Sequence, residues 1–384
     1  MRIALSTSVL QRGKSGVGQY ILALARALLD HPGDHQLVLL VLEEELPLVS
    51  FAQGRAEIIT VPERYRRAIR NILWHHSRLP NLLRQFEIDV LHVPSYRRMV
   101  WSAPCARVAT IHDLAPFHVK GKYDPARMFY GRVVVKQLAR RQDEIIAISE
   151  NTARDIERFF GIPVTRQNII YNGIDHQRFV PGDPAAARKE VESRWKLDAP
   201  YFLYVSRLEH PAKNHVRLFE AYNRFKAQTR LPWLLAIGGG DWPGADFIRA
   251  AAAQSPFARD IRFLGFVPDA ALPSLYQAAE TMVYPSLFEG FGFPPIEAMA
   301  CGCPVLSSTR GALAEVLGEA AEVLDPENIE DMSNGLTRMA SDANRREELR
   351  RRGFAHSRRF DWHANAGQVL GIYQKAIVRR TRGA

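Results

Sequence analysis

The sequence predicts an α/β protein made of two doubly wound parallel-sheet domains. Short apolar runs with strand character alternate with longer helical stretches along all 384 residues, which is the pattern of parallel sheets covered by helices on both faces. The alternation starts again after a polar stretch with proline and glycine, residues 179–185, which we interpret as a linker. At about 150 residues per domain, a chain of this length accommodates two such domains.

Strands of the first domain are expected at residues 2–5, 37–42, 90–93, 107–111 and 144–148. Those of the second are expected at 201–205, 234–237, 261–264, 281–284 and 304–307. Helical stretches lie between them, for example at 18–29, 125–141 and 151–160, and the apolar spacing near the end predicts a last helix over 362–379. We therefore expect an N-terminal domain over 1–182, a second domain over 183–361 and a C-terminal helical segment over 362–384.

The composition excludes several classes of protein. Hydrophobic residues make up 47% and charged residues 24%, as in ordinary globular proteins. No apolar run approaches the ~20 residues of a membrane-spanning helix, and the N-terminus lacks the apolar core of a signal peptide. The three cysteines, Cys105, Cys301 and Cys303, provide neither a disulfide framework nor a zinc-binding spacing. We expect a cytoplasmic protein.

Positive charge is concentrated in the first half of the chain. The net charge is +10, and residues 1–180 hold 25 basic and 17 acidic side chains, against 26 and 24 in residues 181–384. A basic domain raises the alternative of a nucleic-acid-binding protein. The arginine clusters lack interleaved aromatic residues apart from Tyr65 and Trp74, and no nucleic-acid-binding module is recognisable. We therefore expect no nucleic-acid partner.

Ligands of doubly wound sheets bind at the carboxyl ends of the strands, so the loops there carry the candidate sites. Gly16 and Gly18 lie in the first such loop, Gly13-Lys-Ser-Gly-Val-Gly18, where glycine lets a phosphate or sugar approach the backbone; a tight strand-to-helix turn is the alternative. The loop matches neither a Walker A motif nor G-x-G-x-x-G, which argues against a dehydrogenase. His112 follows the strand at 107–111, either facing a ligand or capping local backbone.

Two loops of the second domain carry stronger signals. Arg207 and Lys213 follow the strand at 201–205, and two cations so placed can hold one anionic group from two sides, although a solvated basic loop has the same composition. After the strand at 281–284, Glu289 lies in a glycine-containing loop and Glu297 on the helix that Pro294 opens. Exposed backbone amides at this helix start suit an anion, and carboxylates accept hydrogen bonds from ribose and sugar hydroxyls.

The segment Glu289-Gly-Phe-Gly-Phe-Pro-Pro-Ile-Glu297 resembles the E-x₇-E signature of retaining glycosyltransferase family 4. The resemblance extends over about 300 residues. It includes Ser15–Gly18, Ile111–Leu114, Tyr171–Asp175, Val205–Asn214 and Gly265–Pro268 with Leu272–Ala278. It implies the GT-B fold, in which two Rossmann-like domains face a central cleft and a C-terminal helix crosses back to the first domain.

The resemblance also implies a role for each matched residue. Arg207 and Lys213 hold the diphosphate of a nucleotide-sugar donor, and Glu297 accepts hydrogen bonds from its ribose. Glu289 contacts the donor sugar and phosphate, together with the backbone of Gly290, Phe291 and Gly292. His112 faces the transferred sugar. Gly16 and Gly18 belong to the loop that approaches the diphosphate, and Val267 borders the base.

The expected chemistry is retaining glycosyl transfer without a metal or other cofactor. The sequence contains no Asp-x-Asp, the carboxylate metal motif of the other glycosyltransferase fold, so Arg207, Lys213 and the helix start at Pro294 are expected to stabilise the leaving phosphate. No residue stands out as a covalent nucleophile. The resemblance therefore implies a front-face mechanism assisted by the leaving phosphate.

The stretch Arg207–Asn214 resembles that of bacterial polysaccharide and O-antigen enzymes, including mannosyltransferases. We favour GDP-mannose as donor, with a UDP-sugar as the alternative, and a glycan or lipid-linked saccharide as acceptor. A nucleotide-sugar epimerase of the same shape is a further alternative, which the context of the two glutamates disfavours.

The basic first domain also suggests contact with a membrane. Four arginines precede an apolar stretch that ends at Trp74, so this segment forms either a basic amphipathic surface or a solvated helix face. The residues are Arg64, Arg66, Arg67 and Arg70, followed by Ile72, Leu73 and Trp74. We expect peripheral contact with anionic lipid at the inner face of the cytoplasmic membrane, at about 1 kcal/mol per surface cation.

Overall fold

The computed structural model describes residues 1–118 and 128–382. The chain divides into two compact units, one of Met1–Gly173 with Phe360–Ala384, and the other of Ile174–Arg359. The stretch 179–185, which we interpreted as a linker, lies within the second unit. Its end forms the start of helix α8 (Pro184–Trp195), where the Asp183 carboxylate accepts a hydrogen bond from the amide of Ala185.

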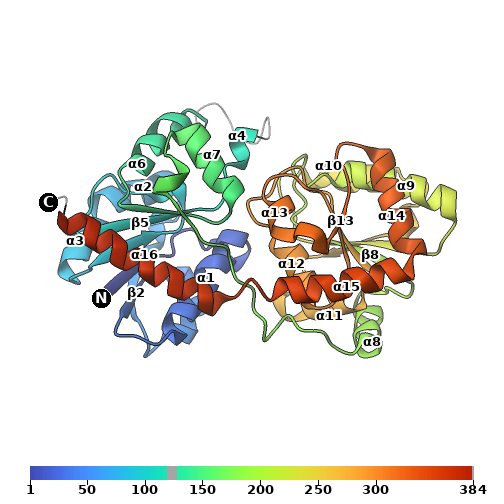
Figure 1. Ribbon diagram of the computed structural model, residues 1–384, viewed down its shortest axis with the longest axis horizontal. Helices are drawn as coiled ribbons and strands as arrows, with labels where there is room; N and C mark the ends of the chain where they lie inside the picture. Colours follow the sequence, from blue (N-terminus) through green and yellow to red (C-terminus); the bar gives the residue numbers. More distant parts are fainter. Residues whose placement is uncertain (119–127, 383–384) are drawn as a thin grey trace. The chain divides into compact units, whose positions relative to one another are not determined.

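The first unit contains a parallel sheet in the order β3-β2-β1-β4-β5-β6-β7 (Figure 1). Its strands are β1 (Arg2–Ser6), β2 (Gln36–Leu42), β3 (Glu57–Val61), β4 (Val90–Val93), β5 (Ala106–Ile111), β6 (Glu144–Ala147) and β7 (Asn168–Ile169). Its helices are α1 (Gly16–Asp30), α2 (Ala68–Ser77), α3 (Leu79–Gln85), α4 (Ala115–His118), α6 (Lys136–Arg140), α7 (Glu150–Phe160) and α16 (Trp362–Arg382).

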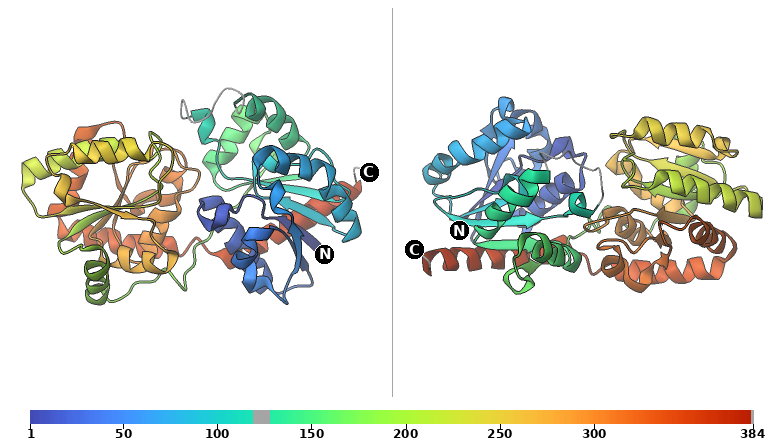
Figure 2. Two further views of the ribbon diagram at one scale, coloured as in Figure 1. Left: turned by 180° about the vertical axis from the view of Figure 1, so that it is seen from behind. Right: turned by 90° about the horizontal axis from the view of Figure 1, so that it is seen from above.

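The second unit repeats this topology with one strand fewer, in the order β10-β9-β8-β11-β12-β13. Its strands are β8 (Tyr201–Val205), β9 (Leu234–Gly238), β10 (Ile261–Gly265), β11 (Thr281–Tyr284), β12 (Val305–Ser307) and β13 (Glu322–Val323). Besides α8, its helices are α9 (His215–Thr229), α10 (Ala245–Ala253), α11 (Leu272–Ala278), α12 (Phe293–Ala300), α13 (Leu313–Leu317), α14 (Ile329–Ser341) and α15 (Ala343–Ser357). Helices cover both faces of each sheet, which confirms the predicted doubly wound architecture (Figure 2).

The order of strands reverses beside the first strand of each sheet. In the first unit β1 lies between β2 and β4, and in the second β8 lies between β9 and β11. The chain therefore leaves neighbouring strands toward opposite sides, and the loops at their carboxyl ends diverge. Such a switch point is where doubly wound sheets bind ligands.

Helix α16 belongs to the first unit although it ends the chain. It packs against α1 and β5, and Val369, Tyr373 and Ala376 are fully buried in the cluster that covers one face of the sheet (Figure 1). The predicted helix over 125–141 begins outside the described residues. From Tyr130 the chain is helical as predicted, with a π-helical segment (Tyr130–Val135) before α6.

The structure corrects the amphipathic surface that the sequence predicts for the basic segment leading into α2. Trp74 is only 4% exposed, because the helical period directs it into the core under β2 and β4. Arg66 forms ion pairs with Glu63 and Glu45, so its charge is compensated within the protein. Leu73 is exposed, as the predicted surface requires, and so is Ile69, which the prediction did not include.

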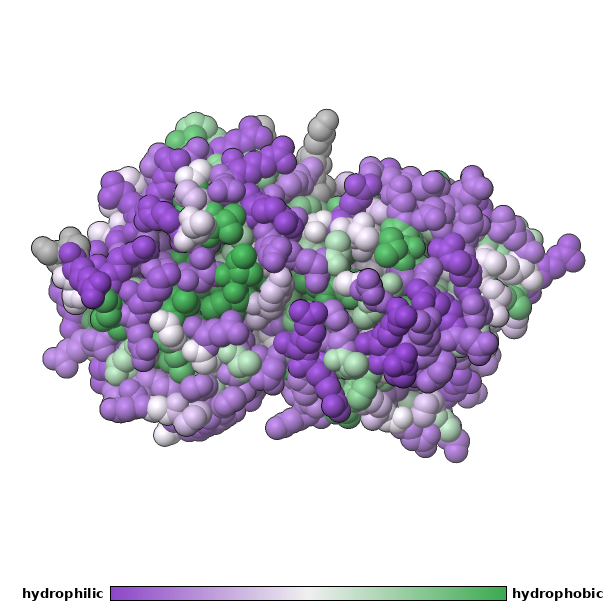
Figure 3. All heavy atoms as spheres, in the orientation of Figure 1, coloured by the Kyte–Doolittle hydropathy of each residue, from purple (hydrophilic) through white to green (hydrophobic). Residues whose placement is uncertain are grey.

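No helix among the described residues combines the length and the apolar character that crossing a membrane requires. On the face seen in Figure 3, hydrophilic side chains predominate and hydrophobic residues form separate patches.

Candidate active site

The predicted anion-binding residues of the second unit lie at its switch point. β8 and β11 are hydrogen-bonded neighbours, and the loops that follow them carry Arg207 with Lys213 and Glu289, respectively. The amide of Leu287 donates to the carbonyl of Ala212 at 3.1 Å, which ties the two loops together. Residues far apart in sequence are thus held at one edge of the sheet.

Lys213 and Glu289 form the centre of this site. Lys213 Nζ lies 2.5 Å from Glu289 Oε1, and each side chain is 13% exposed. The same carboxylate oxygen accepts hydrogen bonds from Ser286 Oγ at 2.6 Å and Tyr284 Oη at 3.0 Å. Burial alone raises the pKa of Glu289, but the Lys213 ammonium and these hydrogen bonds outweigh burial and hold it below its usual range. Glu289 is therefore ionised at neutral pH.

Gly311 fixes the backbone around Glu289. The residue adopts a φ of +67°, and a Cβ there would lie 2.2 Å from the carbonyl oxygen of Glu289. That carbonyl accepts a hydrogen bond from the amide of Ala312 at 2.8 Å. Only glycine permits both the left-handed backbone and this close approach.

Arg207 is held between a carboxylate and an aromatic ring. Its Nη2 donates to Glu209 Oε2 at 2.9 Å, and its guanidinium carbon lies 4.4 Å from the ring centroid of Trp242. Gly239 allows this arrangement, because a Cβ there would lie 1.8 Å from the carbonyl oxygen of Ser206. Arg207 therefore bonds to Glu209, whereas Lys213 bonds to Glu289.

Glu297 lies on α12, separate from the Lys213–Glu289 pair. Its Oε2 accepts a hydrogen bond from Tyr276 Oη at 3.0 Å. Burial raises the pKa of Glu297 to about 7, and the Arg178 charge opposes that rise. Glu297 therefore changes charge near neutral pH, unlike Glu289.

The start of α12 places glycines and prolines as the sequence predicts. Gly292 caps the helix with a φ of +95°, and Pro294 lies in its first turn. Gly290 and Phe291 are buried, and the Phe291 ring contacts Phe293 at a centroid distance of 5.2 Å. Pro294 and Pro295 cannot donate hydrogen bonds, so the amides of Gly290 to Phe293 are the donors available at this end.

Val267 and Phe266 occupy the loop after β10. Val267 is buried against Gly238 at the end of β9, while the neighbouring Phe266 is 57% exposed. The loop thus presents backbone and an aromatic ring beyond the carboxyl ends of the strands.

His112 of the first unit follows β5, as the sequence predicts. Its ring bonds to the backbone of Pro94 and meets the Tyr20 ring edge-on at a centroid distance of 4.6 Å. Burial lowers the pKa of His112 to about 4, so the imidazole is neutral at pH 7. Its Nε2 is buried and has no hydrogen-bond partner among the described residues. A buried nitrogen in this state is suited to a ligand hydroxyl.

Gly16 and Gly18 differ in their surroundings. Gly16 is the first residue of α1, and Ser15 caps the helix by accepting a hydrogen bond from the amide of Gly18 at 3.1 Å. A Cβ at Gly18 would lie 2.4 Å from the carbonyl oxygen of Leu10. Gly18 thus packs against backbone, and Gly16 is the more accessible of the two at the helix start.

A buried polar chain links the region of His112 to α16, which the sequence analysis did not anticipate. Tyr373 Oη lies 2.7 Å from His92 Nδ1, His92 Nε2 lies 2.8 Å from Thr110 Oγ1, and Thr110 Oγ1 lies 3.1 Å from Tyr20 Oη. Tyr20 contacts His112 directly. Sequence reasoning also missed Glu209, Trp242 and Tyr276. Glu209 lies within the Arg207–Lys213 motif and Tyr276 within the matched segment Leu272–Ala278, whereas Trp242 belongs to no recognised motif.

Two doubly wound units, one with a cation- and carboxylate-lined switch point, define a glycosyltransferase of the GT-B fold. Residues 14–178 match the family model "Glycosyltransferase Family 4", and residues 187–356 match "Glycosyl transferases group 1". Together the two matches span most of the chain, which belongs to this glycosyltransferase family.

Two similar proteins and one solved structure are consistent with membership of this family. The chain is 28% identical to O-antigen chain mannosyltransferase B of Escherichia coli, over 97% of this chain and 100% of that protein. It is 30% identical to the serotype-specific mannosyltransferase WbdA of Escherichia coli, over 72% of this chain and 34% of that longer protein. Sucrose-phosphate synthase from Thermosynechococcus elongatus has the same fold, with a TM-score of 0.79, 20% identity and coverage of 98% and 99% of the two chains.

Proposed function

We propose that the protein is a retaining, metal-independent hexosyltransferase that uses a nucleoside-diphosphate sugar. The observation that carries this proposal is the placement of Arg207 and Lys213 in one loop at the switch point of the second unit, with Lys213 bonded to Glu289 in the loop that leads into α12. Two cations and a helix start provide what a diphosphate needs as it becomes the leaving group. The absence of Asp-x-Asp from the sequence supports metal independence.

Each site residue has a proposed role in holding the donor. Arg207 and Lys213 bind the diphosphate, and Glu297 accepts hydrogen bonds from the ribose hydroxyls. Glu289 orients Lys213 and contacts the donor sugar, together with the amides of Gly290 to Gly292. The backbone near Val267 borders the base.

The first unit contributes two proposed contacts. His112, whose Nε2 has no hydrogen-bond partner in the described part of the chain, presents this nitrogen to a hydroxyl of the transferred sugar. Gly16 lets the backbone approach the diphosphate.

Both cations are paired with carboxylates, so the diphosphate must compete for them. Arg207 lies 2.9 Å from Glu209, and Lys213 lies 2.5 Å from Glu289. These four charges sum to zero, so donor binding is not driven by a bare positive cavity. Helix-start amides supply the additional stabilisation, and each such donor contributes about 3–4 kcal/mol to the transition state in comparable sites.

Retention of anomeric configuration is proposed through a front-face reaction. The bond from the anomeric carbon to the phosphate oxygen breaks, the phosphate oxygen takes the proton of the acceptor hydroxyl, and that hydroxyl attacks from the same side. Lys213 and Arg207 stabilise the charge that develops on the phosphate. NMR of the product linkage tests this step, and an inverted anomeric centre would contradict it.

GDP-mannose is the proposed donor and a glycan or lipid-linked saccharide the proposed acceptor. Similarity to two mannosyltransferases of Escherichia coli, one of which the chain matches over its full length, supports mannose. Turnover of GDP-mannose and UDP-glucose with a mannan oligosaccharide acceptor tests the donor. Turnover of the UDP-sugar alone would contradict the choice of nucleotide.

We propose that the exposed surface formed by α2 and the residues just before it makes peripheral contact with anionic lipid. Ile69 is 75% exposed and Leu73 60% exposed, and Arg64, Arg67 and Arg70 are exposed nearby. Apolar side chains flanked by cations suit an interface with acidic headgroups. Co-sedimentation with phosphatidylglycerol vesicles should weaken in Leu73→Ser and should not change in Val323→Ser, an exposed apolar control in the second unit. Equal binding to phosphatidylcholine vesicles would contradict the electrostatic part.

A further inference from the structure

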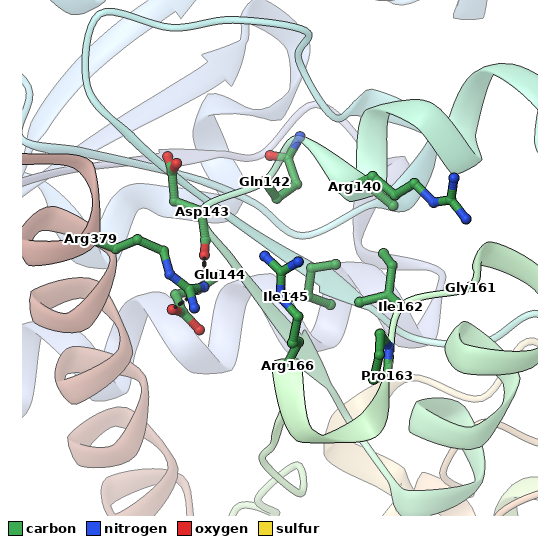
Figure 4. Close-up of a pocket in the computed structure, with 11 residues that line it drawn as sticks. Arg140, Gln142, Asp143, Glu144, Ile145, Gly161, Ile162, Pro163, Arg166 and Arg379 are labelled. Atoms are coloured by element: carbon green, nitrogen blue, oxygen red, sulfur yellow. Dashed lines mark hydrogen bonds and ion pairs between the residues drawn. The ribbon is translucent and has the colours of Figure 1, made fainter. Parts of the chain in front are cut away.

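A cavity of about 200 Å³ lies in the first unit, at the edge of the sheet where β6 begins (Figure 4). The end of α6, the loop after α7 and the last turns of α16 surround it. Its lining includes three arginines that come from three separate segments: Arg140, Arg166 and Arg379. The site proposed for sugar transfer uses the opposite edge, because His112 follows the carboxyl end of β5 whereas Glu144 opens the parallel neighbour β6.

The carboxylates of this cavity are already compensated. Asp143 forms an ion pair with Arg107 at 3.2 Å. The Glu144 side chain is fully buried and pairs with Arg379 at 2.8 Å and Lys375 at 3.1 Å. The two carboxylates are therefore paired with three cations, which are Arg107, Lys375 and Arg379. The floor of the cavity consequently does not repel an anion.

Arg166 and Arg140 add positive charge that no described carboxylate balances. Arg140 Nε donates to the carbonyl oxygen of Phe160 at 2.9 Å, which fixes the side chain without neutralising it. Arg166 is exposed, and its side chain has no hydrogen bond or ion pair with any described residue, although its amide donates to the carbonyl oxygen of Pro163 at 2.9 Å. In Figure 4 its guanidinium points toward the side of the cavity where Arg379 enters from α16, while Arg140 points the other way.

Gly161 leaves room for the Arg140 side chain. It ends α7 in the left-handed conformation, with a φ of +66°, and a Cβ there would lie 2.6 Å from Arg140 Nη2. The left-handed backbone turn favours glycine, and without a Cβ at this position the Arg140 guanidinium can lie close to the backbone.

We propose that this cavity binds a phosphate group. The planar donors of arginine match phosphate oxygens, and the cavity carries an excess of positive charge. Besides Gln142 and Gly161, the uncharged lining is aliphatic, with Ala139, Ile145, Ile162 and Pro163, and the lining includes no aromatic side chain that would stack on a base. The ligand is therefore a phosphate that carries no stacked base, supplied either as a free phosphate compound or as a lipid headgroup.

Titration of the full-length protein with pyrophosphate, by calorimetry at constant ionic strength, tests the site. Arg166→Ala should weaken one binding event about tenfold, because it removes one charged fork. Arg84→Ala, an exposed arginine on α3 of the same unit, is the matched control and should leave binding unchanged. Arg207→Ala should retain the Arg166-dependent event, so failure of the donor site and failure of this one are distinguishable.

A second arm separates the two sources of phosphate. Flotation with phosphatidylglycerol vesicles should depend on Arg166 if the ligand is a headgroup, and should not depend on it if the ligand is a free phosphate compound. Either result, combined with Arg166-dependent pyrophosphate binding, supports the site. Pyrophosphate binding that is absent, or that is equal in the wild type and Arg166→Ala, overturns the proposal.

Discussion

Glu297→Gln should stabilise the second unit at alkaline pH while weakening donor binding. Burial raises the pKa of Glu297 to about 7 from an ordinary value of 4.5. The unfolded chain therefore releases this proton near pH 4.5, whereas the folded chain holds it until about pH 7. Stability falls as the pH rises through that window, because the folded state binds more protons than the unfolded state.

The size of the effect follows from the two pKa values. Integrating the linkage relation gives a destabilisation of about 1 kcal/mol at pH 5 and about 3 kcal/mol at pH 8. Glutamine does not titrate, and its side-chain oxygen still accepts the hydrogen bond from Tyr276. The free energy of unfolding of Glu297→Gln relative to wild type should thus increase by about 2–3 kcal/mol between pH 5 and pH 8.

Urea unfolding at both pH values measures this difference. Because the chain has two compact units, the change should appear in the transition of the second unit. Glu319→Gln, at an exposed position of the same unit, serves as the control. The reasoning is refuted if the difference between Glu297→Gln and wild type is the same at pH 5 and pH 8, or if it changes in the opposite direction.

The same substitution probes function. An ionised carboxylate accepts hydrogen bonds from ribose hydroxyls more strongly than an amide oxygen does. The affinity of Glu297→Gln for the donor at pH 8 should therefore be about tenfold lower than that of the wild type. The variant should thus be more stable and bind the donor less well, because the buried carboxylate of Glu297 lowers stability but contributes to donor binding. Calorimetric titration with the nucleoside diphosphate at pH 8 provides the affinity.

Three further perturbations test other parts of the account. Arg207→Ala or Lys213→Ala should lower kcat/KM at least about 100-fold in a steady-state assay, and losses below tenfold in both would remove their assignment. Burial lowers the pKa of His92 to about 3 and that of His112 to about 4. When the pH falls from 7 to 5, the free energy of unfolding of the first unit, measured with urea, should therefore decrease by about 2 kcal/mol per histidine. Equal stability at the two pH values would contradict the burial of these histidines as neutral groups. Gly311→Ala should destabilise the second unit by at least about 2 kcal/mol in thermal unfolding, since its Cβ would collide with backbone, and an unchanged melting temperature would refute this.

The predicted strands are found where the apolar runs lie, because a parallel strand buried on both faces must be apolar throughout. The strands that sequence reasoning missed are edge strands. β3 is partly exposed along its length, and β7 and β13 have only two residues each. These three strands are either partly exposed or only two residues long, so their sequences lack the signal of a buried apolar run, whereas the five-residue edge strand β10 was predicted.

The candidate site was predictable where its residues share a local motif. Arg207 with Lys213, and Glu289 with Glu297, were recognised from short segments after strands. The partners Trp242 and Tyr276 were not assigned to these residues, because the fold brings them from other segments. Trp242 reaches Arg207 from the loop after β9, and Tyr276 reaches Glu297 from α11.

The basic segment before α2 shows the same limit. Its charges are visible in the sequence, but whether they are compensated depends on tertiary contacts. Arg66 forms an ion pair with Glu45, which lies about twenty residues earlier in the chain. Trp74 is buried because the helical period places it on the face of α2 that packs against the core. The exposed apolar residues of α2 are therefore Ile69 and Leu73.

The central claim is that Arg207 and Lys213 hold the diphosphate of a nucleotide-sugar donor at the switch point of the second unit. Calorimetric titration of GDP and UDP into the wild type, Arg207→Ala and the control Arg224→Ala tests it most directly. We predict that GDP binds to the wild type and to Arg224→Ala, and that its affinity falls about 100-fold in Arg207→Ala. Equal affinity in all three proteins, or no binding of either nucleotide to the wild type, would contradict the account.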